Sequence, residues 1–514
     1  MPHVASCVLA QPAVHSSADQ DRAHRAVDGD GRRHEQPNSA KRRGRRADQS
    51  RAGRSNRSQL ALALATGRPQ ERAGGCRDSV DLGLLSELFA VDRLEAALAG
   101  QSLRQGRGRL PPARTIYLML GLCVFARASY QEVLARLWPG CAGTDEAVPN
   151  KSSLCRARLR LGCQVMASLF QTMAQPLATV LTPGAFWNGL RVMAIDGTTL
   201  EVPASLANEH AFGGQRDQSG RRVGFPQIRL LGMVECATHA LVDVALGGYG
   251  DGEQELAAQL VGSLCKGMLV LADRGFLSVA LWTTYHDAGA HLLWRLKGNV
   301  ATKVVARLPD GTYLARIRPS KATWVPGQRR PPILVRIIEY RLAGSGLLYR
   351  LATSLLDHQH APAPELARLY VRRWMFETAA DELKTHQRGG GVVLRSSSPD
   401  GVRQEVWAHL LLHYGARKLM SEAACTLHSD PDPTRISFTL TLNIIQRSIL
   451  RAPSLPGPDR LAAIAELTQP RALILRRPRT YPRTVKHPSS RYPGRSPGPI
   501  ATSSRASQHS ITLV

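Results

Sequence analysis

Two aspartates stand in stretches of sequence that are otherwise apolar and typical of buried strands. Asp196 interrupts RVMAIDGTTLEV, and Asp273 lies near the end of GMLVLADRGF. Either one alone is typical of an aspartate that caps a turn, because a lone carboxylate in an apolar strand is costly unless its charge is compensated. Together they suggest a site for Mg²⁺, which binds through carboxylate oxygens. Phosphodiester chemistry commonly uses two such ions about 4 Å apart, and Glu377 is the candidate third ligand.

The helix expected around Glu377 has a second chemical feature. At about 100° per residue, one aromatic residue, two cations and one carboxylate share a face within about 60°: Tyr370, Arg373, Glu377 and Lys384. This stripe suits a surface that holds metal ions beside DNA phosphates. It suits equally well a solvated face with an Arg373–Glu377 pair, which would contribute only a few tenths of a kcal/mol. Trp374 fits stacking on a flipped base, but packing in the core on the opposite side of the helix is the preferred interpretation.

The surrounding elements predict a mixed α/β sheet. Residues 191–276 have the pattern of three strands, a helix and a fourth strand. Strand-like patterns continue over 290–356, and a long helix is predicted over 363–387, ended by three glycines. This order indicates a sheet with an inserted β-rich region ahead of the helix that carries Glu377.

A helical region is predicted ahead of the sheet, over about 82–175. The apolar run Thr115–Ala126 is too short to cross a membrane and suits a buried core helix. Ser129 and Glu132 have the spacing of a capping box at the start of another helix. A further helix carries three arginines along its length: Arg156, Arg158 and Arg160. Capping and periodicity do not distinguish a helix-turn-helix DNA reader from a plain helical bundle, so both interpretations stand.

The chain of 514 residues carries a large positive charge. It has 67 Lys+Arg against 40 Asp+Glu, a net charge of +27. Residues 1–80 contribute +7 and residues 471–514 contribute +9, which leaves +11 for the middle. This excess favours a polyanionic partner, either nucleic acid or an anionic membrane surface. Few large apolar residues occur before Leu60, so we expect residues 1–79 to be disordered or to follow a start codon assigned too far upstream.

Several other classes of protein are not supported. The amino terminus lacks the basic and apolar regions of a signal peptide, and no stretch is long and apolar enough to span a membrane. Nine cysteines are scattered without a CxxC pair or the spacing of zinc ligands. We therefore expect a cytoplasmic protein with reduced thiols, without a structural zinc or a cysteine nucleophile.

Three motifs in order give the sequence a family resemblance. It resembles the DDE transposases of bacterial insertion sequences, in the insertion sequence four family, which carry a Tyr-x2-Arg-x3-Glu-x6-Lys signature. The four residues of the helical stripe match that signature, Ile195–Thr198 resembles the first acidic motif and Ala272–Phe276 the second. The helical region resembles the amino-terminal domain of these enzymes. The resemblance covers about residues 82–420.

The resemblance implies a ribonuclease-H-like α/β catalytic domain with an inserted β-rich region at about 290–356, preceded by a small all-α domain. We expect five segments along the chain: a disordered basic segment over 1–79, a helical domain and candidate DNA-binding module over 80–175, the catalytic domain over 185–425, a helical segment over 426–470 and a disordered basic tail over 471–514.

The resemblance also assigns roles to residues. Three carboxylates would hold two Mg²⁺ ions, with Mn²⁺ as a substitute: Asp196, Asp273 and Glu377. Arg373 and Lys384 would grip DNA phosphates near the cut end, and Tyr370 would support that grip. Water would cleave the phosphodiester at the element's end, and the 3′-hydroxyl so released would attack target DNA. The implied partners are double-stranded DNA, at the terminal inverted repeats and at the target, and a second copy of the chain. The implied location is the bacterial cytoplasm, at the nucleoid when DNA is bound.

Two other functions stay open from the sequence. One is a ribonuclease-H-like nuclease that cuts DNA without joining it, and the other is a catalytically silent DNA-binding remnant that represses the element. The helical stripe and the helical front domain argue against the first, and the three intact carboxylates argue against the second. A membrane-surface protein is least supported, because the positive charge is not gathered on an amphipathic helix.

Overall fold

The computed structural model describes residues 82–99, 110–138, 149–319, 331–342, 348–427, 429–451, 459–474 and 511–513. All of them belong to the second of two compact units, Gly74–Val514. The expectations for residues 1–79 and 475–510 lie outside the described residues.

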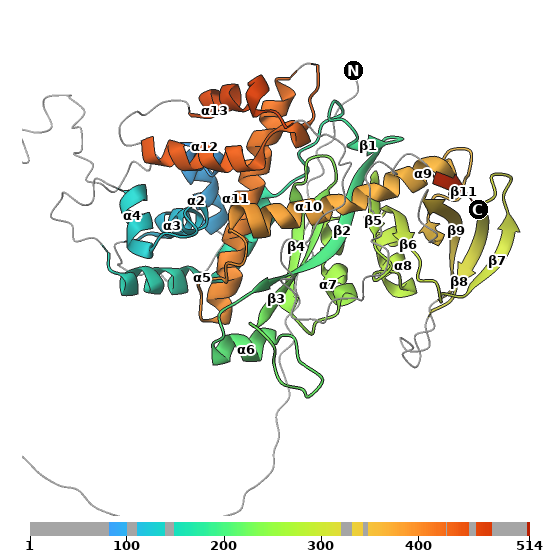
Figure 1. Ribbon diagram of the computed structural model, residues 1–514, viewed down its shortest axis with the longest axis horizontal. Helices are drawn as coiled ribbons and strands as arrows, with labels where there is room; N and C mark the ends of the chain where they lie inside the picture. Colours follow the sequence, from blue (N-terminus) through green and yellow to red (C-terminus); the bar gives the residue numbers. More distant parts are fainter. Residues whose placement is uncertain are drawn as a thin grey trace, which may run out of the picture. The chain divides into compact units, whose positions relative to one another are not determined.

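One mixed sheet of eleven strands organises the described part of the chain (Figure 1). Its order is β4-β3-β2-β5-β6-β10-β9-β8-β7, with β1 paired to β2 and β11 to β9. The strands are β1 Phe186–Trp187, β2 Leu190–Glu201, β3 Gln227–Glu235, β4 Leu241–Gly248, β5 Met268–Ala272, β6 His291–Arg295, β7 Thr302–Arg307, β8 Tyr313–Ile317, β9 Ile333–Leu342, β10 Leu348–Thr353 and β11 Ile511–Leu513.

The first five of these strands after β1 have the ribonuclease-H-like arrangement. β2, β3 and β4 pair antiparallel, whereas β5 and β6 continue the sheet on the other side of β2 in parallel. Every residue of β5 is buried, which is typical of a parallel strand covered on both faces. The predicted fold class is therefore confirmed.

The β-rich insertion widens this same sheet. β10 pairs antiparallel with β6, placing Leu351 opposite Arg295, and β9, β8 and β7 follow in antiparallel order. The stretch 290–356 contains the strands β6 to β10, and the strand-like patterns predicted all of them except β7.

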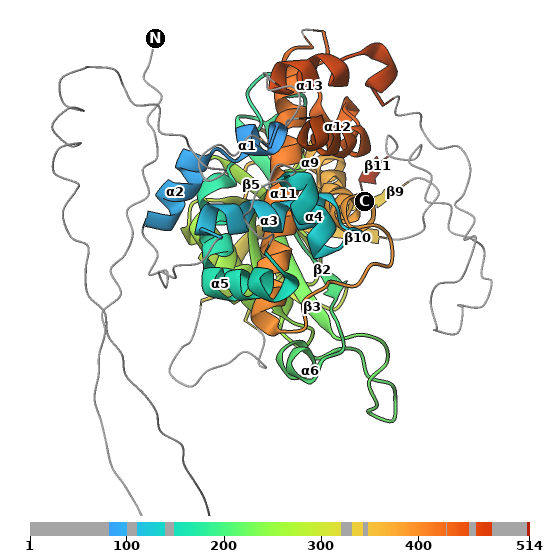
Figure 2. The same cartoon turned by 90° about the vertical axis from the view of Figure 1, so that its left-hand side faces the viewer.

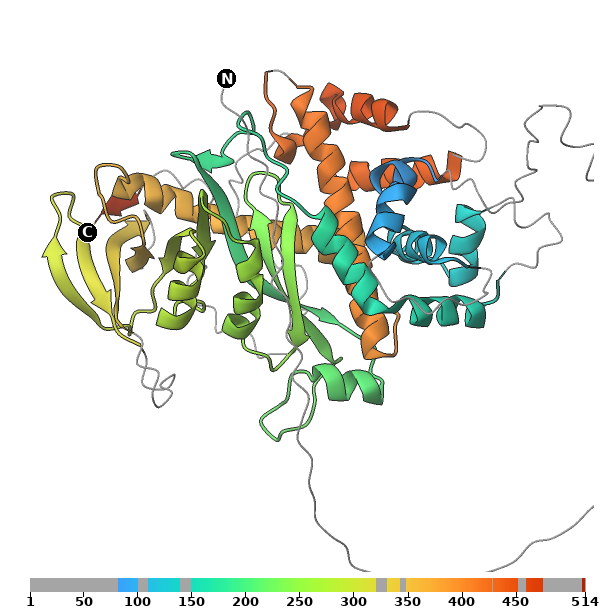
Figure 3. The same cartoon turned by 180° about the vertical axis from the view of Figure 1, so that it is seen from behind.

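The described residues also form a set of α-helices, some of which cover the two faces of the sheet. They are α1 Leu84–Leu88, α2 Val91–Ala99, α3 Pro112–Val124, α4 Tyr130–Leu137, α5 Lys151–Met173, α6 Leu206–Phe212, α7 Glu253–Gln259, α8 Val279–Asp287, α9 Ala363–Tyr370, α10 Met375–Asp381, α11 Pro399–Cys425, α12 Phe438–Arg451 and α13 Asp459–Leu467. α7 and α8 lie on one face (Figure 3) and pack in a core with β5, β6, β8 and β9. α9 and α10 lie on the opposite face, in a larger core that also includes α3, α5 and α11.

The helix predicted over 363–387 is present but is not regular. α9 continues through a 3₁₀ turn, Val371–Trp374, into α10, and a π-helical segment, Glu382–Gln387, ends it. The angle of 100° per residue therefore does not hold throughout. Gly232 of β3 lets α10 approach the sheet, because a Cβ atom there would lie only 3.0 Å from the ring of Phe376.

The amino-terminal helices share a core with the mixed sheet. Residues Thr115–Val124 of α3 are buried, as predicted. Ser129 and Glu132 form the predicted capping box of α4. The long helix α11 packs against both α3 and α5 (Figure 2). α5, which carries the three arginines, continues to Met173 through a kink at Gly162, whose φ of 74° favours glycine.

Some elements differ from the expectations. The carboxyl-terminal tail was predicted to be disordered over 471–514, but Ile511–Leu513 forms β11, which is a correction to that prediction. The reason is that β9 extends past β8 and offers an open edge, where Leu513 pairs with Tyr340. The helices α6 and α8 and the strand β7 were not predicted. Within the described residues, none of the helices combines the length and the apolar character needed to cross a membrane.

Candidate active site

The parallel pairing of β2 with β5 brings the two aspartates together. Ile195 stands opposite Ala272 in the register, so Asp196 and Asp273 follow at neighbouring positions. Both lie on the sheet face that α9 and α10 cover, since Ala194 and Leu271 point into the same core as those helices. The two carboxylates therefore lie side by side on this face of the sheet, next to the irregular helix.

Arg373 connects the aspartates with Glu377. Its guanidinium forms an ion pair with Asp196 and lies 3.7 Å from Glu377 Oε1. Arg373 is buried, whereas the side chain of Glu377 is 53% exposed. Burial disfavours the charged form of Arg373, but the surrounding acidic groups outweigh burial and raise its pKa. Arg373 is thus a fixed positive charge between two of the proposed carboxylates.

The other two members of the helical stripe also contact the sheet. The Tyr370 hydroxyl donates a hydrogen bond of 3.2 Å to the carbonyl of Ala272, the residue before Asp273. Lys384 Nζ donates one of 3.1 Å to Thr198 Oγ1 on β2. Burial raises the pKa of Tyr370 and lowers the pKa of Lys384. The stripe therefore faces β2 and the carboxyl end of β5, and only part of the stripe is exposed to solvent.

Burial raises the pKa of Asp196 above its ordinary value. The positive charge of Arg373 and the amide of Gly197 oppose this rise. The negative charges of Asp273 and Glu253 add to it. Concentrated negative charge of this kind is stabilised by a cation.

The donor atoms fit a divalent metal ion in type. Carboxylate oxygens are the ligands that Mg²⁺ takes, and Asp273 Oδ1 is buried with no hydrogen-bond partner in the protein. In the part of the chain that the structure describes, no three His, Cys, Asp or Glu side chains are gathered closely enough to hold an ion. The guanidinium of Arg373 stands between Asp196 and Glu377, so these two carboxylates contact the same cation and not each other.

Glu253, at the start of α7, was missed from the sequence. Its Oε1 lies 3.0 Å from where a Cβ of Gly197 would be, and its Oε2 lies 3.7 Å from the corresponding point at Gly275. It also lies 3.4 Å from Arg229. Gly197 and Gly275, which lack a Cβ atom, thus leave room for the carboxylate of Glu253 beside the site. Only the acidic run DGEQE could have signalled it.

Trp374 corrects one expectation from the sequence. It was placed preferentially in the core, but 51% of it is exposed, and Arg373 Cζ lies 5.7 Å from its ring centre. The 3₁₀ turn at 371–374 alters the direction of the side chains relative to a regular helix. Trp374 is therefore free to contact a ligand beside the carboxylates.

The three arginines of α5 have different surroundings. Arg158 is buried and donates hydrogen bonds to Gln404 and Ser396, so it holds α5 against α11. Arg156 and Arg160 are exposed. In a regular helix, residues two apart point in directions that differ by about 200°. Arg156 and Arg160 therefore share a face of α5, and Arg158 points to the opposite side.

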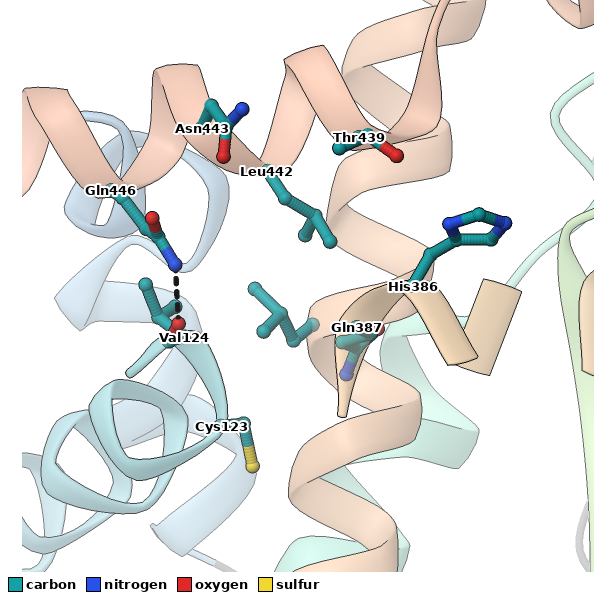
Figure 4. Close-up of a pocket in the computed structure, with 9 residues that line it drawn as sticks. Cys123, Val124, His386, Gln387, Thr439, Leu442, Asn443 and Gln446 are labelled. Atoms are coloured by element: carbon teal, nitrogen blue, oxygen red, sulfur yellow. Dashed lines mark hydrogen bonds between the residues drawn. The ribbon is translucent and has the colours of Figure 1, made fainter. Parts of the chain in front are cut away.

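A small pocket lies away from the carboxylates, between α3, the π-helical segment and α12 (Figure 4). Its lining includes Cys123, Gln387 and Leu442, and Gln446 Nε2 donates a hydrogen bond of 2.7 Å to the carbonyl of Val124 beside it. Its volume of about 60 Å³ has room for about two water molecules. Such a pocket is too small for a nucleotide.

Comparisons with known proteins identify relatives of the chain. Residues 187–414 match the family described as "Transposase DDE domain", and residues 79–171 match "Insertion element 4 transposase N-terminal". The chain is 28% identical over 393 residues to the Escherichia coli (strain K12) transposase InsG for insertion sequence element IS4, covering 75% of this chain and 87% of that protein. It is 25% identical over 204 residues to the putative transposase InsZ of the same organism, covering 39% of this chain and 66% of the relative.

A solved structure is also similar in part. The piggyBac transposase in a synaptic complex with hairpin DNA aligns with 77% of this chain and 86% of its own, at 10% identity and a TM-score of 0.38. The two family matches lie in the order that the motifs predicted and include Asp196, Asp273 and Glu377. The chain belongs to the DDE transposases of the insertion element 4 type.

Proposed function

We propose that this DNA transposase cuts the terminal inverted repeats of its own insertion element with Asp196, Asp273 and Glu377. The observation that carries the proposal is that Asp196, within β2, and Asp273, just after β5, stand at neighbouring positions of adjacent strands, beside the buried Arg373. DDE transposases generally use divalent metal ions, and we infer two Mg²⁺ ions here, with Mn²⁺ as a substitute. When bound, such ions activate the attacking oxygen and stabilise the leaving oxygen.

The chain's own residues would bind and orient the DNA. Arg373 is the cation nearest the carboxylates, and a DNA phosphate would compete with Asp196 for its guanidinium. Lys384, tethered to Thr198, would offer a second positive charge on the same side. Tyr370 would fix the end of β5, and thereby Asp273, through its bond to Ala272. Trp374, exposed beside Arg373, would stack on an unpaired base.

The element's two ends must be held together, so we infer that a homodimer acts on the terminal repeats and on target DNA. The excess of positive charge would supply much of the affinity by release of counterions, and binding should weaken steeply as salt rises. We place the protein in the bacterial cytoplasm, where its DNA is.

Cleavage of a supercoiled plasmid that carries the element's ends tests the function. The full chain with Mg²⁺ is expected to release the element with free 3′-hydroxyl ends and to join those ends to a second plasmid. Glu377→Ala should do neither, because it removes a carboxylate next to Arg373. Cutting without joined product would favour the nuclease interpretation. Binding without any cutting by the unaltered chain would favour the repressor.

We further propose that α5 reads bases at the element's end. Its exposed side chains include Arg156, Arg160 and Leu159, the last 68% exposed. Arginines pair with guanine edges and apolar side chains contact thymine methyl groups in the major groove.

Arg156→Gln/Arg160→Gln is therefore expected to weaken binding to the element's end by about ten- to hundred-fold per lost base contact. Binding to a random duplex should change far less. Fluorescence anisotropy with the two duplexes measures both. If the variant keeps the full preference for the element's end, α5 is not the reading helix.

A further inference from the structure

The strand register relates the outer strands of the insertion to the catalytic face of the sheet. Ile338 of β9 points into the same core as α9 and α10, so Leu334, four residues earlier, points to the same face. Arg316 of β8 stands opposite Leu334, and Lys303 of β7 stands opposite Arg316. Lys303 and Arg316 therefore lie on the face that carries Asp273.

Two arginines of the insertion are paired with carboxylates. Arg336 is buried, with Asp310 Oδ2 at 2.6 Å, and Arg350 lies 3.0 Å from Glu339. In contrast, three cations at the outer end are exposed and have no carboxylate within ion-pair distance among the residues that the structure describes: Lys303, Arg316 and Arg318. We call these three the outer cation row. Leu334, between this row and the buried part of β9, is 41% exposed.

Arg295 continues the positive charge inward from the outer cation row. It is the next residue after Trp294, which pairs with Ala272, so it stands beside Asp273 in the sheet. Its guanidinium lies 4.3 Å from the ring centre of Tyr349 on β10. The catalytic face thus carries basic side chains both beside the carboxylates and at its outer end, as a track for an anionic backbone would require.

The spacing of the strands gives the length of this track. Four strand intervals separate β5 from β8 in the sheet order β5-β6-β10-β9-β8, which is about 19 Å across the strands at 4.8 Å per strand. Arg295 aligns with Ile338 of β9 through Leu351, whereas Arg316 stands opposite Leu334, so the row is also displaced by four residues, or about 13 Å, along the strands. The two displacements combine to about 23 Å. Successive phosphates of one DNA strand advance about 3.4 Å along the duplex, so the outer cation row would meet phosphates about seven base pairs from the carboxylates.

We propose that the outer cation row binds the DNA backbone about seven base pairs from the scissile phosphate. This inference rests on the proposed function, because it takes the carboxylates as the site of cutting. Lysine and arginine contacts to phosphate add affinity and fix the position of the duplex without reading its sequence. The row would thus hold the flanking duplex in line with the site.

The test compares two exposed arginines on opposite faces of the insertion. Arg307 of β7 stands opposite Tyr313, whose side chain packs in the core of the other face, so Arg307→Gln is a matched control for Arg316→Gln. Binding of the full chain to a duplex that spans the element's end is measured over a range of salt concentrations. Arg316→Gln should reduce the slope of log affinity against log salt by about one, and Arg307→Gln should leave the slope unchanged.

A second measurement locates the contact on DNA. Uncharged methylphosphonate linkages are placed one at a time along the duplex. Those about seven base pairs from the cut bond should weaken binding of the unaltered chain but not of Arg316→Gln. Equal salt slopes for the two variants, or an effect of the neutral linkages that is the same in both proteins, would overturn the inference. Because both readouts are binding, a chain that binds but does not cut would contradict the proposed function while leaving this contact measurable.

Discussion

Asp196→Asn is expected to abolish cleavage of the element's ends while DNA binding survives. The substitution keeps the size of the side chain but removes the charge that a divalent ion requires. Loss of several kcal/mol of charge stabilisation, at a factor of ten for each 1.36 kcal/mol, corresponds to a decrease of at least about a thousand-fold. Binding should persist, because phosphate contacts come from cations. Plasmid cleavage in Mg²⁺ and anisotropy with a duplex of the element's end measure the two properties separately.

Asp243→Asn provides a matched control for this substitution. Asp243 lies on β4 of the same sheet, is half-buried, and also has a pKa raised by burial. It accepts a hydrogen bond of 2.6 Å from Ser263, on the side of the sheet away from the carboxylates. Its substitution should lower stability modestly and leave cleavage per folded molecule unchanged. Cleavage by Asp196→Asn within ten-fold of the unaltered chain would remove this aspartate from the active site.

Arg417→Met is expected to destabilise the fold by about 3–5 kcal/mol, the cost of leaving a buried charge without its partner. Arg417 of α11 donates to Glu382 of the π-helical segment and lies 2.9 Å from His239 Nδ1. His413 Nε2 lies 3.2 Å from the same Glu382. Although burial alone would raise the pKa of Glu382, Arg417 and the histidines hold it well below its ordinary value. This cluster attaches the end of the catalytic helix to α11.

The pH dependence of that loss has a definite sign. A carboxyl group with a lowered pKa contributes stability above the pKa of the unfolded chain and loses it as the pH falls through the folded pKa. The variant should therefore be most destabilised near neutral pH, and less so in acid. Urea midpoints of the variant and the unaltered chain, measured near neutral pH and in acid, test this pH dependence.

Arg460→Met is the control for Arg417→Met. Arg460 pairs with Glu422, also on α11, but both side chains are partly exposed, and such a pair contributes only about 0–1 kcal/mol. If Arg417→Met shifts the urea midpoint no more than Arg460→Met, the buried cluster does not stabilise the fold. The double variant Glu382→Gln/Arg417→Met should recover part of the loss, because it removes both buried charges.

The sheet and the neighbouring positions of Asp196 and Asp273 could be predicted because their signals are local, whereas the role of the three carboxylates stays a prediction. β5 is an apolar run that ends just before Asp273, and Asp196 follows the apolar run VMAI within β2. The capping box of α4 spans only four residues. The order of these elements is enough to indicate a sheet in which Asp196 and Asp273 become neighbours. Motifs at fixed spacing then connected the elements with a family.

The parts that could not be predicted depend on contacts between distant residues. Glu253 approaches the site only because α7 packs beside two glycines on other elements. Arg158 is buried by partners more than two hundred residues away. Trp374 is exposed because the helix tightens into a 3₁₀ turn, and β11 forms because β9 extends past β8. None of these contacts leaves a periodic pattern in the sequence.

The core shared by α3, α5, α11 and the sheet fixes the distance between α5 and the carboxylates. If α5 holds bases at the element's end, the number of base pairs from those bases to the cut bond is set by the packing of side chains. One inserted base pair would move the bond by about 3.4 Å and turn it by about 34° about the duplex axis. Insertions and deletions within the element's ends should therefore be purged in evolution more strongly than base substitutions at the same positions.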